Sequence, residues 1–272
     1  PATLRRQRQM CIRDSPRSDM AEFITLMESE GKIHIVELAE ESVKIKGLGV
    51  FNPHELLSGS SVGEEILIGQ KYLTVMPSRL PELISGMARR AQTISPKDAG
   101  QFISRLGVGP GDVVVEAGLG SGALSMHLAR VMGNSGHLIT AEPRNDHAEI
   151  GLMNLERASE CFPEFPKHTH LEGMIEDLVP DVEIDAVILD MPVHRPAILA
   201  LAKNMKIGAR IACYAPTTAQ LENCWDSCEE AGLKVTWCGE LMERQWGKTS
   251  KGGMRPVNGP FGHTAFLLFA QK

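Results

Sequence analysis

The sequence lacks the features that define several large classes of protein. It contains no apolar run long enough to cross a membrane, which predicts a soluble globular protein without a membrane span. Its six cysteines form no CxxC pair and no regular framework, so we expect reduced thiols in the cytoplasm and neither a disulfide scaffold nor a metal site. No G-x-x-x-x-G-K-[ST] motif is present, which argues against a P-loop nucleoside triphosphatase (NTPase).

Positive charge and aromatic residues are also scarce. The formal net charge is −6, so the molecule as a whole is not a non-specific binder of polyanions. Any contact with nucleic acid must therefore come from a local basic surface. Aromatic residues make up only 5% of the chain, which leaves few platforms on which bases could stack. The 272 residues suffice for one large domain, or for a domain with a smaller one attached.

The most informative stretch is a short apolar strand that runs into a glycine turn and then a helix. The β-branched residues of Val113–Val115 predict a buried strand, and glycine follows at three alternate positions, 118, 120 and 122. Such a turn lets backbone N–H groups and the helix N-terminus approach a ligand, where a Cβ atom would block both the turn and the approach. Glu142 ends the next apolar strand, where an acid can bind the two hydroxyls of a ribose.

The spacing of this loop and the acid beside it indicate the kind of ligand. The loop reads G-x-G-x-G and not G-x-G-x-x-G, which favours S-adenosylmethionine (SAM) over a dinucleotide. Glu116 would repel a pyrophosphate, but it suits a ligand that carries an ammonium group and a sulfonium. A glycine loop alone is often an ordinary tight turn. Together with its flanking strand, its helix and Glu142, the loop predicts SAM as the cofactor.

The chain divides into three regions. Residues 1–19 carry five arginines without apolar periodicity, so we expect a disordered tail or a misassigned start upstream of Met20, with a basic RNA-binding arm as the alternative. Residues 20–79 contain short strand-like runs separated by turns, which predicts a small β domain that docks substrate or holds subunits together. Residues 80–272 are expected to form the SAM-binding catalytic domain, starting with a helical connector over Leu80–Thr93.

Strands and helices alternate through the third region. Ser95 is a candidate N-cap, Pro96 fits the first helical position, and Asp98 is placed to reach back as in a capping box. Alternating units of this kind predict an α/β fold with a mostly parallel, Rossmann-like sheet covered on both faces. The last two strands lack a helix between them, so one of them should run antiparallel.

A second candidate site follows the fourth core strand of the predicted sheet. Asp190 lies at the carboxyl end of that strand, the edge at which ligands bind in such sheets. Pro192 cannot extend the strand and restrains Met191, so the turn should present Asp190 rigidly toward the SAM pocket. Its carboxylate could accept a hydrogen bond from an exocyclic amine and then a proton, which suits methyl transfer to a ring nitrogen of a nucleobase. The alternative is that Asp190 only caps a helix or starts a turn.

A basic, glycine-rich segment at residues 244–262 is the candidate surface for RNA. It contains no acid, its glycines predict a flexible loop, and Trp246 offers a face for stacking. An ordinary solvated loop is the alternative. Its basic residues are Arg244, Lys248, Lys251 and Arg255.

Several segments together resemble one enzyme family, the tRNA N1-adenosine methyltransferases that modify position 58 of the T-loop. They are Ser95–Ala99, Glu116–Gly122, Arg244–Trp246, Asp190–Pro192 and Gly262–Leu267, and the resemblance extends from about Gly47 to the C-terminus. It implies a class I SAM-dependent fold, tRNA as the substrate, and a homotetramer as in bacterial and archaeal members. It leaves open whether adenosine 57 is methylated as well.

The resemblance also implies roles for individual residues. Asp190 would be the catalytic residue. The cofactor would contact Glu116, Gly118, Leu119, Gly120, Ser121, Gly122, Ala123, Glu142, Pro143, Arg144, Met174, Glu176 and Asp190. The tRNA would contact Ser95, Lys97, Arg244, Trp246, Lys248, Lys251, Arg255 and His263, although His263 fits a structural hydrogen-bonding role better than a catalytic one.

The sequence departs from the family pattern at two positions. Ser95 stands where many members have a tyrosine thought to help position the target base. Met174 follows Gly173 where many have an aspartate that contacts the adenine of SAM, and Glu176 is the candidate substitute.

Two other functions remain open at this point. The first is SAM-dependent methylation of another substrate class, as in protein isoaspartate or precorrin methyltransferases. The basic segment and the separate β domain argue against it, because neither substrate requires them. The second is a non-catalytic tRNA-binding subunit, against which the intact glycine loop and Asp190 argue.

Overall fold

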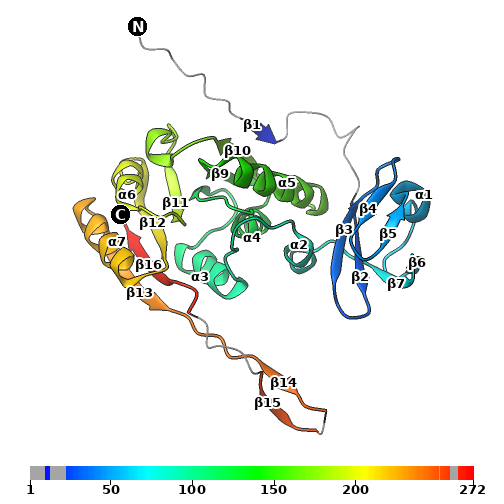
Figure 1. Ribbon diagram of the computed structural model, residues 1–272. Coiled ribbons are helices and arrows are strands. Elements are labelled where there is room, and N and C mark those ends of the chain that lie inside the picture. The colour runs from blue at the N-terminus through cyan, green and yellow to red at the C-terminus, as the bar shows by residue number, and fades with distance from the viewer. Residues whose placement is uncertain (1–9, 13–22, 251, 258–262) are drawn as a thin grey trace.

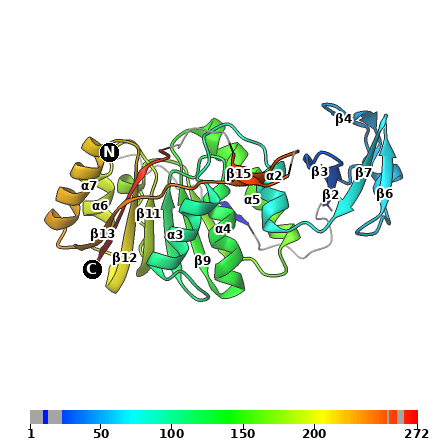
Figure 2. The same cartoon turned by 90° about the horizontal axis from the view of Figure 1, so that it is seen from below.

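The computed structural model describes residues 10–12, 23–250, 252–257 and 263–272, which form a large α/β domain and a small β domain. The small domain lies at one end of the molecule and α7 (Thr218–Glu230) near the other (Figure 1 and Figure 2). Within these residues, no helix combines the length and the apolarity needed to span a lipid bilayer. Of the expected site residues, Lys251 lies outside the described part of the chain.

The large domain is built on an eight-stranded sheet with the order β1-β10-β9-β8-β11-β12-β16-β13. Neighbouring strands from β10 to β12 pair in parallel, whereas β16 is antiparallel to both β12 and β13. This confirms the α/β prediction, including the antiparallel terminal strand. The strands are β1 (Met10–Ile12), β8 (Val113–Ala117), β9 (His137–Ala141), β10 (Lys167–Leu171), β11 (Ile184–Leu189), β12 (Met205–Ala215), β13 (Lys234–Glu240) and β16 (Phe266–Gln271).

Helices pack against both faces of this sheet, because neighbouring strand residues point to opposite sides. Val114 belongs to a core shared with α3, α4 and α5, whereas Val115 belongs to a core shared with α6 and α7, and both are fully buried. Burial of each such side chain contributes about 1.5–3 kcal/mol. The helices are α2 (Leu80–Gly86), α3 (Pro96–Leu106), α4 (Ala123–Met132), α5 (Asn145–Cys161), α6 (Arg195–Leu201) and α7, with single 3₁₀ turns at Gly133–Ser135 (η1) and Ile175–Asp177 (η2).

The small domain is an antiparallel sheet of order β3-β2-β7-β6, with a separate hairpin of β4 and β5. Its own core contains Leu26, Leu57 and Leu73, all fully buried. The short α1 was not predicted; it begins after Asn52, whose side chain caps it by accepting from the backbone N–H of Glu55. The elements are β2 (Phe23–Glu28), β3 (Ile33–Glu37), β4 (Val43–Ile45), β5 (Gly49–Phe51), α1 (Pro53–Leu57), β6 (Glu65–Ile68) and β7 (Lys71–Met76).

Three expectations about secondary structure need correction. A flexible loop was expected over residues 244–262, but β14 (Trp246–Lys248) and β15 (Met254–Pro256) pair there as a hairpin that projects from the body of the molecule (Figure 1). The expected helical connector over Leu80–Thr93 ends at Gly86. Within residues 1–19, expected to lie outside the fold, β1 pairs antiparallel with β10 at the sheet edge; the rest of that segment lies outside the described residues.

Candidate cofactor and substrate site

The glycine loop is held tightly against the strand that carries Asp190. Gly118, Gly120 and Gly122 have φ angles of 95°, 53° and 78°, in the region that disfavours residues with a Cβ atom. The N–H of Gly118 donates to the carbonyl of Ala141 at 2.9 Å. A Cβ atom on Gly118 would lie 2.0 Å from the carbonyl oxygen of Asp190, so only glycine fits there. The loop thus brings the carboxyl ends of β8, β9 and β11 together.

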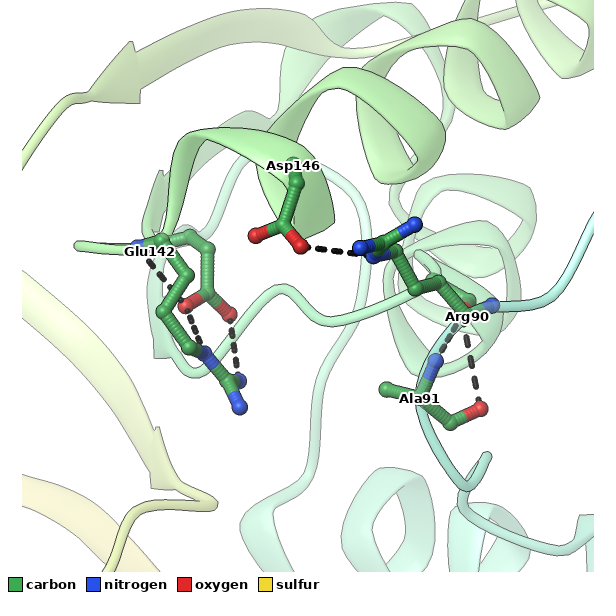
Figure 3. A network of polar contacts seen from close by, with 6 residues as sticks. Arg90, Ala91, Glu142 and Asp146 are labelled. Carbon is green, nitrogen blue, oxygen red and sulfur yellow. Dashed lines mark hydrogen bonds and ion pairs between the residues drawn. The ribbon is translucent and has the colours of Figure 1, made fainter.

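The segment after α2 packs onto this loop. Ser121 Oγ accepts from the backbone N–H groups of Arg90 and Ala91, each at 3.1 Å (Figure 3). Asn154, on α5, donates to the carbonyls of Ala88 and Ser121 at 2.8 and 2.9 Å and accepts from the N–H of Ala88 at 3.2 Å. These side chains replace helical hydrogen bonds, which explains why the predicted connector helix stops early. The segment therefore covers part of the glycine loop.

Glu142 lies immediately after β9, at the point that the sequence predicted for a ribose-binding acid. Its side chain is only 1% exposed, and its two oxygens accept hydrogen bonds from the backbone N–H and the guanidinium of Arg144 (Figure 3). Its Oε2 atom also accepts from the backbone N–H of Gly120. Burial works to raise the pKa of this carboxyl, but the bonds from Arg144 and Gly120 outweigh it and hold the pKa below its ordinary value. Glu142 is thus an ionised acceptor next to the glycine loop.

Glu116 is the acid beneath the glycine loop. It is 2% exposed and accepts a hydrogen bond from Ser125 Oγ at 2.6 Å. Burial raises the pKa of its carboxyl to about 8, with a smaller contribution from the charge of Asp190. The carboxyl is therefore protonated at neutral pH until a cation approaches it. A ligand with an ammonium group would supply such a cation, so this environment fits SAM.

Asp190 follows β11 directly, and its N–H donates to the carbonyl of Ala117 at 2.9 Å. The backbone at Asp190 is therefore held to the neighbouring strand. No described residue forms a hydrogen bond to the Asp190 carboxylate. Burial raises its pKa to about 6; Glu142 adds to this effect, while His194 and Arg144 oppose it. The side chain is a partly desolvated acceptor that is available to a ligand.

A buried polar cluster lies at the start of α3. Asp98 is fully buried, and it accepts hydrogen bonds from Lys97 Nζ at 2.7 Å and from the hydroxyls of Ser95 and Thr264, each at 3.0 Å. Ser95 occupies the predicted N-cap position, but its hydroxyl binds the Asp98 side chain and makes no capping bond to the backbone. Lys97 also donates to Thr264 at 2.8 Å and is mostly buried. Ser95 and Lys97, both expected to contact tRNA, therefore form their hydrogen bonds within the protein.

Two side chains close to Asp190, those of Tyr214 and His194, were not predicted from the sequence as site residues. Tyr214 lies near the carboxyl end of β12, and its hydroxyl contacts Thr264; burial, with the charges of Asp98 and Asp190, raises its pKa to about 12. His194 is buried before α6, and its ring contacts the carbonyl of Tyr214 at 3.2 Å. The rule that identified Asp190, a polar residue at the carboxyl end of a core strand, also identifies Tyr214.

The loop after β10 carries Met174 and Glu176, the two residues expected near the adenine of SAM. Gly173 has a φ of 151°, and Met174 is 36% exposed beside it. Glu176 lies in η2, and its Oε2 atom is buried without a hydrogen-bond partner. An unpaired buried acceptor is costly, so this oxygen is suited to receive a donor from a ligand.

The expected RNA-binding residues near the C-terminus are divided between two places. The projecting hairpin and its approach carry Arg244, Trp246, Lys248 and Arg255, all exposed. His263 lies apart from the hairpin tip: its ring nitrogens contact Glu240 Oε2 at 2.8 Å and the carbonyl of Pro216 at 3.1 Å. The contact with Glu240 raises the pKa of His263, which agrees with a structural role.

The chain is similar to known proteins over most of its length. Residues 72–251, more than half of the chain, match the family described as "tRNA methyltransferase complex GCD14 subunit". The chain is 27% identical to tRNA (adenine(57)-N(1)/adenine(58)-N(1))-methyltransferase TrmI of Methanocaldococcus jannaschii, over 93% of this chain and 95% of that protein. It is 28% identical to tRNA (adenine(58)-N(1))-methyltransferase TrmI of Thermus thermophilus, over 92% and 96%.

The fold is similar to that of a solved enzyme. A SAM-dependent O-methyltransferase from Thermotoga maritima superposes with a TM-score of 0.75 and 26% identity, over 93% of this chain and 94% of that one. The match includes the small β domain as well as the sheet, because it extends over nearly the whole chain. On the strength of the family match, the chain belongs to the GCD14 family of tRNA methyltransferase complex subunits.

Proposed function

We propose that this protein is a SAM-dependent tRNA (adenine-N1)-methyltransferase that modifies adenosine 58 of the T-loop. The observation that carries the proposal is Asp190: its backbone lies against the glycine loop, and its carboxylate has no hydrogen-bond partner among the described residues. Membership of the GCD14 family and two relatives named for this reaction, similar over nearly their whole length, support it.

The residues around the loop fit the cofactor. Glu142 would hold the ribose, Glu176 an amino group of the adenine, and Glu116 the ammonium of the methionine part. The other expected contacts follow from the same placement, since Gly118–Ala123, Pro143 and Met174 line the same three loops. Arg144 lies in the second of these loops, where its guanidinium binds Glu142 in the empty protein. When bound, SAM supplies an activated methyl group.

The chain's own residues would then position the base and manage its proton. N1 of adenine is neutral, so it needs no base to attack, but the ring becomes cationic once it is methylated. Asp190 would accept a hydrogen bond from the exocyclic amine, stabilise the growing charge and take the proton. Because N1 lies on the Watson–Crick edge, the adenine must first leave its stack, at a cost of a few kcal/mol.

The projecting hairpin is the surface we propose for the tRNA backbone. Its exposed cations can bind phosphates, and Trp246, which is 57% exposed, can stack on a base. Lys251 is part of the same proposal, while Ser95, Lys97 and His263 would act only at the rim of the site. Alanine at Lys248 and Arg255 should weaken tRNA binding and reduce its salt dependence by about one unit of slope for each phosphate that the variant no longer neutralises. An unchanged slope would remove the hairpin from the RNA surface.

We further propose a cytoplasmic homotetramer. The approach to the hairpin and its second strand expose Met242, Met254 and Val257, each more than half exposed. A monomer rarely leaves such apolar side chains together in solvent, so a second copy of the chain would cover part of this surface. The small β domain, residues 20–79, would dock substrate or support the assembly. Analytical ultracentrifugation tests the oligomer, and a monomer at micromolar concentration would contradict it.

One assay separates this function from its alternatives. Unmodified tRNA transcript is incubated with the protein and methyl-labelled SAM, and the modified nucleoside is mapped by mass spectrometry. Label at N1 of adenosine 58 is expected, and the same map shows whether adenosine 57 is modified too. Label that enters protein or small molecules but not tRNA would indicate the isoaspartate or precorrin class. No binding at millimolar SAM in calorimetry would indicate a non-catalytic subunit.

A further inference from the structure

The carboxylate of Glu142 is fully occupied by the protein itself. A carboxylate offers about four lone-pair positions, and four donors fill them here. Oε1 accepts from the Arg144 backbone N–H at 3.2 Å and from Arg144 Nε at 2.8 Å. Oε2 accepts from Arg144 Nη2 at 3.1 Å and from the Gly120 N–H at 3.1 Å. Two of the four donors belong to one guanidinium, which binds both oxygens in the paired geometry typical of arginine and carboxylates.

A ribose diol needs those same two oxygens. The two backbone donors are fixed by the glycine loop and by the chain after β9, so they stay when a ligand arrives. The guanidinium is the part that can leave, because it ends a long side chain that is 57% exposed while Glu142 is only 1% exposed. The guanidinium and the diol therefore exclude each other at Glu142.

We propose that Arg144 is a cofactor-responsive latch: its guanidinium occupies the ribose-binding carboxylate of Glu142 in the empty protein, and the cofactor releases it to bind the RNA backbone. The inference rests on the proposed function, and it adds a binding order in which the cofactor comes first and tRNA second.

The surroundings of Arg144 support RNA as the next partner. Of the two other acids close to it, Asp146 is already paired with Arg90 at 2.6 Å (Figure 3). Asp190 is the acid that receives the target base. A released guanidinium thus stays close to Asp190, where the base would bind, without a carboxylate reserved for it. A nucleotide that places its base at Asp190 brings its flanking phosphates near Arg144, and a phosphate offers the paired oxygens that a guanidinium binds best.

The first test measures cofactor affinity. S-adenosylhomocysteine (SAH) is titrated by calorimetry into the full-length protein and into Arg144→Met, which keeps the apolar stem and removes the competing charge. We expect the variant to bind SAH about three- to tenfold more tightly, because no ion pair has to be broken. Equal or weaker binding would overturn the latch, and weaker binding would show that Arg144 contacts the cofactor directly.

The matched control is Arg195→Met. Arg195 makes the same paired contact with Glu230, at 2.9 and 2.6 Å, and is similarly exposed at 51%. Its pair does not involve an acid of the glycine-loop site, so its removal should leave the SAH affinity unchanged. A gain equal to that of Arg144→Met would show that a missing surface charge, and not the release of Glu142, causes the effect.

The second test measures coupling between the two ligands. The affinity for tRNA transcript is measured by fluorescence anisotropy with and without saturating SAH. In the wild-type protein SAH should tighten tRNA binding about fivefold or more, and tRNA should tighten SAH binding by the same factor. Arg144→Met should lose this coupling, whereas Arg130→Met, which removes a charge at the far end of α4, should keep it.

The outcomes also separate the latch from the proposed function. Wild-type protein that binds no SAH would refute the cofactor site itself. Wild-type protein that binds SAH but shows no coupling, or coupling that persists in Arg144→Met, would refute the latch alone.

Discussion

The two sides of the site differ in how they treat a carboxylate at the end of a strand. On the side proposed for the cofactor, Glu142 accepts four hydrogen bonds, and its pKa is held below the ordinary value. On the side proposed for the target base, Asp190 accepts none from the described residues, and burial raises its pKa to about 6. A saturated, ionised acid suits a fixed acceptor, whereas a free acid of raised pKa suits proton transfer. Environment, not residue type, separates the two roles.

The largest expected effect comes from removing the free acid. Asp190→Asn should lower the turnover of tRNA methylation by about 10³-fold, because it deletes the proton acceptor while it keeps the shape of the side chain. The affinity for SAH, measured by calorimetry, should change less than twofold. If SAH affinity falls as far as turnover, Asp190 holds the loop together and the contrast between the two sides disappears.

The next largest effect is a loss of folding stability where the glycine loop contacts the backbone of Asp190. Gly118→Ala places a Cβ atom 2.0 Å from the Asp190 carbonyl, whereas Gly111→Ala, at a similar φ of 89°, meets no atom within 4 Å. The strained backbone alone costs about 1–2 kcal/mol, so we expect that cost for Gly111→Ala and at least about 2 kcal/mol more for Gly118→Ala. Urea unfolding measures both. Equal losses of unfolding free energy in the two variants would mean that the loop and the strand move apart at little energetic cost.

The pH dependence of turnover sharpens the contrast further. The Asp190 carboxyl must be ionised to accept a proton, and its pKa is about 6. The single-turnover rate should therefore fall about tenfold per pH unit below 6 and level off above it. Rates are measured with saturating SAM and tRNA, and circular dichroism confirms that the fold persists. A flat profile down to pH 5 would assign the proton to another group.

The smallest expected effect is the pH dependence of SAH affinity that arises from Glu116. The Glu116 carboxyl, with a pKa of about 8, carries a proton at pH 7 in the empty site, and an ammonium group would displace it. SAH affinity should therefore rise severalfold as the pH increases from 7 to 8, with proton release visible in calorimetry across buffers of different ionisation enthalpy. Glu116→Gln should abolish the release. Proton uptake in the wild-type protein would contradict the assignment.

The sequence predicted the parts of the site that depend on local pattern. The strand, the glycine turn, Glu142 and Asp190 follow from strand periodicity and from the rule that ligands bind at carboxyl ends. The expected connector helix failed for a non-local reason: Ser121 and Asn154, 30 and more residues away, bind its backbone. The burial of Asp98 depends on Thr264, across 166 residues, so local capping rules could not reveal it.

Local sequence pattern also fails to predict very short strands and the partner that a charged side chain selects. The β14–β15 hairpin was hidden because glycine and basic residues predict a loop, while its strands are only three residues long. The guanidinium of Arg144 binds Glu142, although Asp146 and Asp190 are also close to it. The spacing of these residues in the sequence does not show which acid it binds.

The attachment of residues 88–91 to the glycine loop has a mechanical consequence. This stretch joins the small β domain to the sheet, and Ser121 and Asn154 fasten it to the loop. The backbone that connects the two domains is therefore held to the glycine loop by hydrogen bonds. A force applied to the small domain, by a bound RNA or a neighbouring subunit, would reach the loop directly through the backbone. Residues inserted between Ala88 and Ala91 should loosen that transmission, whereas the same insertion in the exposed turn at Glu40–Ser42 should leave it intact.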